Sequence, residues 1–149
     1  RGTLSTRYGR HPRDRKRFTS RGGSKKAVTH YQVLERLPGA TLVELRLETG
    51  RTHQIRVHLS ELGFPILGDP LYGRPSRQRP VQAVAAQLTH QALHARLLGF
   101  IHPISGQKLC FASSPPPDFL AALTSLRGRQ DSPPLPWNPS PDRPEAAHP

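Results

Sequence analysis

The apolar residues of this 149-residue chain are concentrated between Ala27 and about Leu126, so one hydrophobic core is expected from this middle part. Polar and apolar residues alternate from Val28 to Glu35, and Leu42 to Leu47 has a similar pattern, which predicts two strands. Pro38-Gly39 between them is typical of a turn. We therefore expect a β-hairpin at the start of the core.

The pattern becomes helical after Gly50. Thr52 is predicted to be the N-cap, and Gly63 occupies the position of a C′ glycine. One face of this short helix carries Ile55, Leu59 and Leu62. We expect Ile55 and Leu59 to pack the helix onto the sheet.

The rest of the core mixes further strands and a helix. Phe64 to Gly73 contains two prolines and two glycines, so it is predicted to be a rigid loop. Leu93 to Ile101 and Lys108 to Ala112 are expected as strands joined by residues 102–106, and Phe119 to Leu126 as an amphipathic helix. Strands and helices are mixed without the regular order of βαβ units.

The charge balance points to a polyanionic partner. Lys and Arg number 22 against 10 Asp and Glu, a net charge of +12, which favours RNA, DNA or an anionic membrane. A membrane span is not expected, because no apolar run approaches the roughly 20 residues that a spanning helix needs. Cys110 is the only cysteine, so a disulfide or thiolate zinc site cannot form within one chain. This is compatible with the reducing cytoplasm, where we expect the protein to reside.

Two terminal segments differ from the core in composition. Residues 1–26 hold ten positive residues opposed only by Asp14, so they could form a flexible solvated arm or a basic loop that follows an RNA backbone. We favour the basic RNA-contacting loop. Residues 128–149 hold seven prolines and are predicted to be disordered or polyproline II, which leaves 1–127 as the folded unit. The chain opens on Arg1 inside charged sequence, so we expect a fragment of a longer polypeptide.

Gly50 to His58 places many hydrogen-bond donors at the beginning of the predicted helix. A helix N-terminus offers free N–H groups and a positive dipole end, and arginine can bind an anion with two hydrogen bonds. These features suit a phosphate or a buried carboxylate, and the residues alone do not choose between them. Alternatively, Arg51 and Arg56 make ordinary surface contacts on a capped helix.

Gly50 to His58, with the sequence GRTHQIRVH, resembles the third conserved motif of the RNA pseudouridine synthases of the RluA and RluD type. The resemblance covers about Gly2 to Leu126 and includes several further motifs in the order of that family: Arg10-His11-Pro12 with Arg15, Lys26 to Tyr31, Gly68 to Gly73, Gln91 to Ala95, and His102 to Gly106. It implies an α+β fold, with a mixed, mainly antiparallel sheet and packed helices. It also implies isomerisation of uridine to pseudouridine, most of all in large-subunit ribosomal RNA, without a metal or organic cofactor.

In that family the second arginine of the motif, Arg56 here, forms a salt bridge with the catalytic aspartate. The family's nucleophile lies in a His-Arg-Leu-Asp segment followed by Thr-Ser-Gly, and its active-site tyrosine in a Lys-x-Tyr-x-Ala pattern; neither occurs in these residues. Asp69 lies in a Gly-Asp-Pro turn, where capping of the loop is the expected role. The resemblance therefore implies that the carboxylate partner of Arg56 is outside this chain, and that the chain alone is inactive. Alternatively, the chain is a non-catalytic RNA-binding protein derived from such a synthase.

We expect basic residues of the N-terminal segment, of the helix start and of the loop after Gly73 to contact RNA: Arg10, His11, Arg13, Arg15, Lys16, Arg17, Lys25, Lys26, Arg51 and Arg74. The protein is expected to be a monomer. Two histidine pairs, His53 with His58 and His90 with His94, could suggest a metal site. Because neither pair has an HExxH glutamate or a cysteine cluster, we expect no metal.

Overall fold

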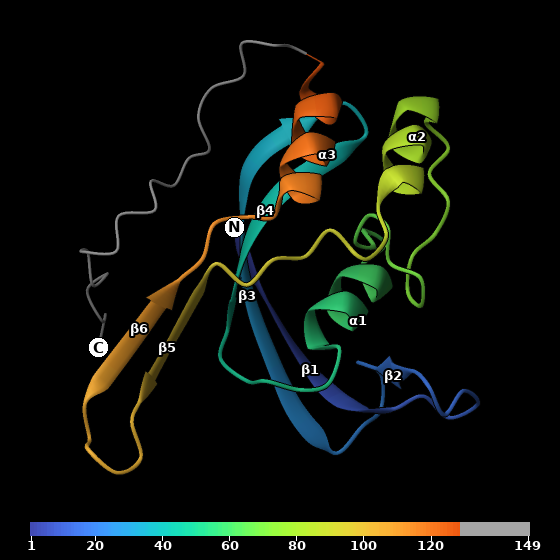
Figure 1. Cartoon of the computed structure of the whole chain (residues 1–149). Coiled ribbons are helices and arrows are strands. Elements are labelled where there is room, and N and C mark those ends of the chain that lie inside the picture. The colour runs from blue at the N-terminus through green and yellow to red at the C-terminus, as the bar shows by residue number, and fades with distance from the viewer. Residues whose placement is uncertain (129–149) are drawn as a thin grey trace.

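The computed structural model describes residues 1–128, and its main feature is a four-stranded antiparallel sheet (Figure 1). The strands are β1 (Gly2–Arg10), β2 (Phe18–Thr19), β3 (Lys25–Leu37) and β4 (Ala40–Leu47), in the order β2-β1-β3-β4. The predicted hairpin is confirmed, since Leu37 pairs with Ala40 across Pro38-Gly39. Gly39 has a φ of 74°, which a glycine adopts without steric cost.

The prediction of one basic loop over residues 1–26 is wrong for its first part. Gly2–Arg10 forms β1 and pairs with β3 from Gly2↔Tyr31 to Tyr8↔Lys25. Alternate residues of β1 point inward, and Tyr8 at its end is only 2% exposed. The alternation of Leu4, Thr6 and Tyr8 with polar residues was a strand signal that the surrounding positive charges obscured. Within residues 1–26, two loops remain, residues 11–17 between β1 and β2 and residues 20–24 between β2 and β3.

Helix α1 (Gln54–Glu61) packs against β2 and β3, as expected, but through a different face. Its buried residues are Gln54, Val57, His58 and Ser60, whereas Ile55 and Leu59 are half-buried and Leu62 is 45% exposed. The predicted apolar contact with the sheet is therefore largely polar.

At the two ends of α1, the predicted N-cap residue is wrong and the predicted C′ glycine is confirmed. The N-cap is His53, with a left-handed φ of 57°, so Thr52 was wrong. Gly63 follows the C-cap residue Leu62 with a φ of 96°, as predicted for a C′ glycine.

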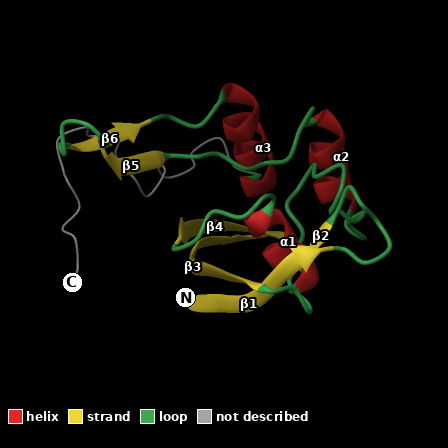
Figure 2. Ribbon diagram, turned by 90° about the horizontal axis from the view of Figure 1, so that it is seen from below, coloured by secondary structure: helices red, strands yellow, loops and turns green. Residues whose placement is uncertain are grey.

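Two further helices pack together beyond the loop of residues 64–73 (Figure 2). Helix α3 (Pro117–Arg127) contains the predicted helix, while α2 (Arg79–Gln87) was not predicted. An ion pair between Arg127 and Glu35 of β3, with Nη2 and Oε2 2.6 Å apart, ties α3 to the main sheet. No helix within residues 1–128 is long and apolar enough to cross a membrane.

Strands β5 (Leu97–Ile101) and β6 (Lys108–Ala112) form a separate antiparallel hairpin that projects from the rest of the chain (Figure 1). The limits of β6 agree with prediction, and β5 starts later than expected. The mixed α and β elements and antiparallel pairs confirm the α+β class. The predicted disordered tail, residues 128–149, lies outside the described residues apart from Gly128.

The core next to α1 is small and aromatic. Its buried members are Tyr8, Ala27, Val57 and Tyr72, with Phe18 and Leu71 packed against them. Because these residues come from β1, β2, β3, α1 and the loop of residues 64–73, the core brings distant segments together beside Arg56.

Candidate active site

Gln54 fixes the turn that leads into α1. Its Oε1 accepts hydrogen bonds from the Thr49 hydroxyl and the Arg51 backbone N–H, at 2.9 and 3.0 Å. Its Nε2 donates to the Val28 carbonyl oxygen and to Thr29 Oγ1, both at 3.0 Å. These bonds tie the beginning of α1 to β3, so the position of Arg56 relative to the sheet is set by a buried polar contact.

Arg56 forms a bidentate ion pair with Asp69. Arg56 Nε donates to Oδ2 at 2.8 Å, and Nη2 donates to Oδ1 at 2.7 Å. The Asp69 side chain is 0% exposed and that of Arg56 13% exposed, so water screens the pair little. In the part of the chain that the structure describes, the third guanidinium nitrogen, Nη1, has no protein acceptor.

Asp69 also caps its own loop. Its Oδ1 accepts hydrogen bonds from the backbone N–H groups of Leu71 and Tyr72, each at 2.9 Å. The predicted capping role of Asp69 is therefore confirmed. Its pairing with Arg56 was not predicted: the carboxylate partner of Arg56 was expected outside this chain, whereas the structure gives Arg56 one at Asp69. One signal was available: Gly68 to Gly73 and Gly50 to His58 are two motifs of the same family resemblance, which could have suggested that they meet in space.

Tyr72 connects the loop of residues 11–17 to α1. The guanidinium carbons of Arg17 and Arg56 lie 5.1 and 5.2 Å from the centroid of its ring, within range of cation–π attraction. Its hydroxyl oxygen accepts a hydrogen bond from the Phe18 backbone N–H at 2.9 Å and lies 3.1 Å from His53 Nδ1. Tyr72 is 3% exposed, so these contacts form a compact buried unit.

The charges of this unit shift one another's pKa values. Burial alone would raise the pKa of the Asp69 carboxyl, but hydrogen bonds from Arg56 and from the Tyr72 and Leu71 N–H groups hold it below its usual value. The hydrogen bond to Asp69 raises the pKa of Arg56. Burial, assisted by the charge of Arg56, lowers the pKa of His53. Asp69 and Arg56 are therefore both ionised at neutral pH, and His53 is neutral.

The loop of residues 11–17 is ordered by its own hydrogen bonds. His11 Nδ1 accepts from the Arg13 and Asp14 N–H groups, and Asp14 Oδ1 accepts from the Lys16 N–H at 2.9 Å. Arg10 Nη1 donates to the carbonyl oxygen of Arg15 at 3.0 Å, and its guanidinium carbon lies 5.3 Å from the Phe18 ring centroid. Two of the predicted RNA-contacting residues, Arg10 and His11, thus help to hold the loop.

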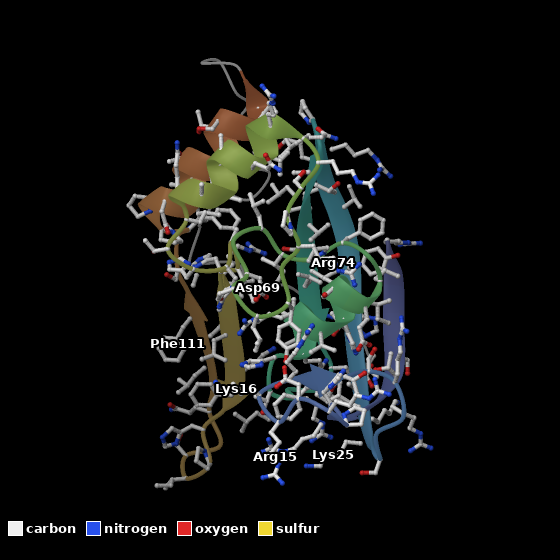
Figure 3. All side chains as sticks on the ribbon, turned by 90° about the vertical axis from the view of Figure 1, so that its right-hand side faces the viewer. Arg15, Lys16, Lys25, Asp69, Arg74 and Phe111 are labelled. Atoms are coloured by element: carbon white, nitrogen blue, oxygen red, sulfur yellow. The ribbon has the colours of Figure 1, made fainter. Side chains whose placement is uncertain are left out.

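Several other predicted RNA-contacting side chains are exposed: Arg13, Arg15, Lys16, Lys25, Lys26, Arg51 and Arg74. Figure 3 shows Arg15, Lys16 and Lys25 at the same end of the molecule, with Arg74 apart from them. The Lys26 ammonium lies 3.8 Å from Glu48 Oε1, and Arg51 Nε donates to the Lys26 carbonyl oxygen at 3.2 Å. The structure therefore brings most of the predicted set together at one end and leaves out Arg74.

The histidine pairs have separate surroundings. His58 is buried between Thr6 and Thr29, whose hydroxyl oxygens lie 2.9 Å from Nε2 and Nδ1, while His53 contacts Tyr72. Among residues 1–128, no three His, Cys, Asp or Glu side chains gather as metal ligands would.

Comparison with known proteins places these motifs in a family. Residues 2–61 match the family model described as RNA pseudouridylate synthase. The chain is 44% identical over 131 residues to the ribosomal large subunit pseudouridine synthase D of Pseudomonas aeruginosa, covering 85% of this chain and 41% of that protein. It is 45% identical over 126 residues to the uncharacterized RNA pseudouridine synthase YlyB of Bacillus subtilis, covering 85% of this chain and 39% of that protein.

Two solved human structures share the fold. Human RNA pseudouridylate synthase domain containing 4 superposes with a TM-score of 0.58 at 30% identity, over 85% of this chain and 56% of the other. Human RNA pseudouridylate synthase domain containing 1 gives a TM-score of 0.60 at 28% identity, over 76% of this chain and 47% of the other. This chain spans about two fifths of the length of the curated relatives it matches. By sequence and by fold, the chain belongs to the RNA pseudouridine synthase family of the RluA and RluD type.

Proposed function

We propose that this chain is part of an enzyme that isomerises uridine to pseudouridine in RNA, and that Arg56 forms an ion pair with its nucleophilic aspartate. The reaction breaks the N1–C1′ bond of uridine and joins C5 to C1′, so reactant and product have the same atoms. An external oxidant or group donor is not required. Residues 1–127 would form the C-terminal portion of the catalytic domain.

The observation that carries this proposal is the way in which Asp69 holds Arg56. Asp69 binds Nε and Nη2, which fixes the plane of the guanidinium and leaves Nη1 without an acceptor among the described residues. A second carboxylate can bind at this remaining edge, because one guanidinium carries five N–H donors. Arg56 can thus hold a second carboxylate in a defined orientation.

The chemistry needs such a partner. An aspartate that attacks C1′ or takes its proton must be ionised although bound uridine excludes water from it. A guanidinium about 4 Å away contributes roughly 4 kcal/mol at an effective dielectric near 20, which offsets much of the desolvation. The 149 residues contain no His-Arg-Leu-Asp segment, so the proposal assigns the nucleophile to sequence outside them.

The substrate proposed is ribosomal RNA of the large subunit. Two observations support it: the name of the Pseudomonas relative, a ribosomal large subunit pseudouridine synthase, and the exposed cations of the loop of residues 11–17, which suit a phosphate backbone. We also propose that the protein is monomeric and works in the cytoplasm. Sedimentation of the full-length protein and fractionation of cells test these last two points.

The direct experiment incubates the full-length protein with an in vitro transcript of large-subunit ribosomal RNA and maps pseudouridine chemically. We expect new pseudouridine at defined positions. Tight RNA binding without product would instead favour a non-catalytic RNA-binding protein derived from a synthase.

A further inference from the structure

Within residues 1–128, Arg17 has no carboxylate partner. It is half-buried, and its Nε is completely buried without a hydrogen-bond acceptor. Within residues 1–128, its other two guanidinium nitrogens also have no protein acceptor, and they are not among the completely buried atoms. An unpaired buried N–H group is unfavourable, so its presence calls for an explanation.

Arg17 nevertheless occupies a defined position. Its guanidinium carbon lies 5.1 Å from the Tyr72 ring centroid, and its backbone is held by hydrogen bonds with His11 and Asp14. The following residue, Phe18, donates its N–H to the Tyr72 hydroxyl. Tyr72 therefore fixes this end of the loop of residues 11–17 by both its ring and its hydroxyl.

The same ring contacts Arg56. The two guanidinium carbons lie 5.1 and 5.2 Å from one centroid, so they are at most about 10 Å apart, comparable with the Debye length at 0.1 M salt. Asp69 compensates the charge of Arg56. Arg17 has no such compensating carboxylate among the described residues, so its charge is available to an anion beside the ion pair proposed to hold the nucleophile.

We infer that Arg17 is a phosphate-binding residue of the active site, which takes a backbone phosphate of the RNA next to the reacting uridine. A polyanion is favoured over an isolated carboxylate because the same loop exposes Arg13, Arg15 and Lys16. Tyr72 then keeps a fixed separation between the bound phosphate and Arg56. This inference rests on the proposed function and adds to it the residue that positions the substrate backbone.

The test measures RNA affinity of the full-length protein over a series of KCl concentrations, with the large-subunit transcript as the probe. Each protein–phosphate contact contributes close to one unit to the slope of log affinity against log salt. Arg17→Gln should therefore reduce the magnitude of this negative slope by about one and weaken binding at low salt. Arg17→Lys should keep the slope. Arg46→Gln is the matched control, because Arg46 is an exposed arginine on β4, at the opposite edge of the sheet from β2.

Arg17→Met keeps an apolar side chain against Tyr72 and gives the same reading if the Gln variant melts early. An unchanged slope in Arg17→Gln and Arg17→Met, or an equal change in Arg46→Gln, would overturn the inference. Pseudouridine formation by the wild type is scored separately. If the wild type forms product but the Arg17 variants have the same salt slope as the wild type, the inference fails and the proposed function stands. A lowered slope without any wild-type product removes the proposed reaction and leaves Arg17 as an RNA-binding residue only.

Discussion

Arg56 and Asp69 form a bidentate ion pair whose carboxylate is completely buried and is also bonded to two backbone N–H groups. One side chain thus orients the arginine and closes the loop that follows the helix. Stability and function of this site are therefore coupled at Asp69.

Replacing Asp69 with Asn should destabilise the fold. The amide keeps the shape of the carboxylate but leaves the mostly buried Arg56 charge uncompensated, which lowers the free energy of unfolding by roughly 3 kcal/mol. Urea denaturation at neutral pH measures this change. Asp118→Asn is the control, because Asp118 is 36% exposed and should change stability by less than about 0.5 kcal/mol. Equal stability of wild type and Asp69→Asn would contradict the structural role of the pair.

The ion pair also predicts acid sensitivity. The pKa of Asp69 is lower in the folded protein than in the unfolded chain, so its stabilisation is complete above the unfolded value near 4. It is lost as the pH falls through the lower, folded value. Asp69→Asn should lack this part of the acid-dependent loss, which denaturation curves at several acidic pH values would reveal.

The buried His58 should cause a second loss of stability, at a less acidic pH than the loss due to Asp69. Burial between Thr6 and Thr29 lowers its pKa, and Glu61 opposes that shift only in part. Because the folded pKa is the lower one, stability is complete above the unfolded value near 6.5 and falls as the pH drops below it. Thermal melting at pH 8 and pH 5 should show a smaller difference for His58→Gln than for wild type. An identical difference would exclude His58 as its source.

Gln54→Ala should destabilise the protein although it removes no charge. It leaves the Thr29 hydroxyl, the Val28 carbonyl and the Arg51 N–H without their Gln54 partners. The Thr29 hydroxyl and the Val28 carbonyl keep a second partner, His58 and the Glu48 N–H, so the cost is that of the lost hydrogen bonds. With about 1 kcal/mol net for each of these three bonds, a total near 3 kcal/mol is expected in urea denaturation. Gln87→Ala provides the control at an exposed position of α2. Stability equal to that control would mean that the turn does not depend on Gln54.

The β5–β6 hairpin is expected to promote association of the 149-residue chain when it is studied apart from the full-length protein, which is proposed to be monomeric. Ile101 and Ile104 are 70% and 92% exposed, and several neighbouring apolar side chains are also exposed. Exposed apolar patches promote association, so Ile101→Lys with Ile104→Lys should raise the concentration at which the 149-residue chain remains monomeric in sedimentation. An unchanged sedimentation profile would show that the hairpin does not mediate association.

Local patterns predicted the fold where the chain follows common rules. Pro38-Gly39 marked the hairpin, and Lys108–Ala112 and the helix near Phe119 were found from periodicity. Strand β1 was missed because positive residues are frequent throughout residues 1–26, although charged side chains are tolerated on the exposed face of a strand. Helix α2 was missed although Val81 and Val84, three residues apart, are buried.

The site could be predicted only in part, because its contacts are not local. The motif containing Arg56 was apparent from the sequence, but its pairing with Asp69 depends on how the loop of residues 64–73 folds back on α1. The position of Arg17 beside Tyr72 joins residues 55 positions apart, which no periodicity reports. The prediction of the buried face of α1 was wrong because the polar residues Gln54 and His58 can be buried there, where hydrogen bonds to the sheet satisfy them.

The most direct test of the proposed role of Arg56 is the turnover of Arg56→Lys in the full-length protein, measured as pseudouridine formed in the ribosomal transcript. Lysine keeps the charge but cannot form the two parallel hydrogen bonds of a guanidinium. We expect kcat to fall by at least about 100-fold, as when an electrostatic donor of an active site is removed, while the Kd for RNA changes by less than about threefold. Arg46→Lys should leave both values unchanged, and thermal melting must show that Arg56→Lys is folded. Wild-type turnover by a folded Arg56→Lys protein would contradict the proposal that Arg56 orients the nucleophile.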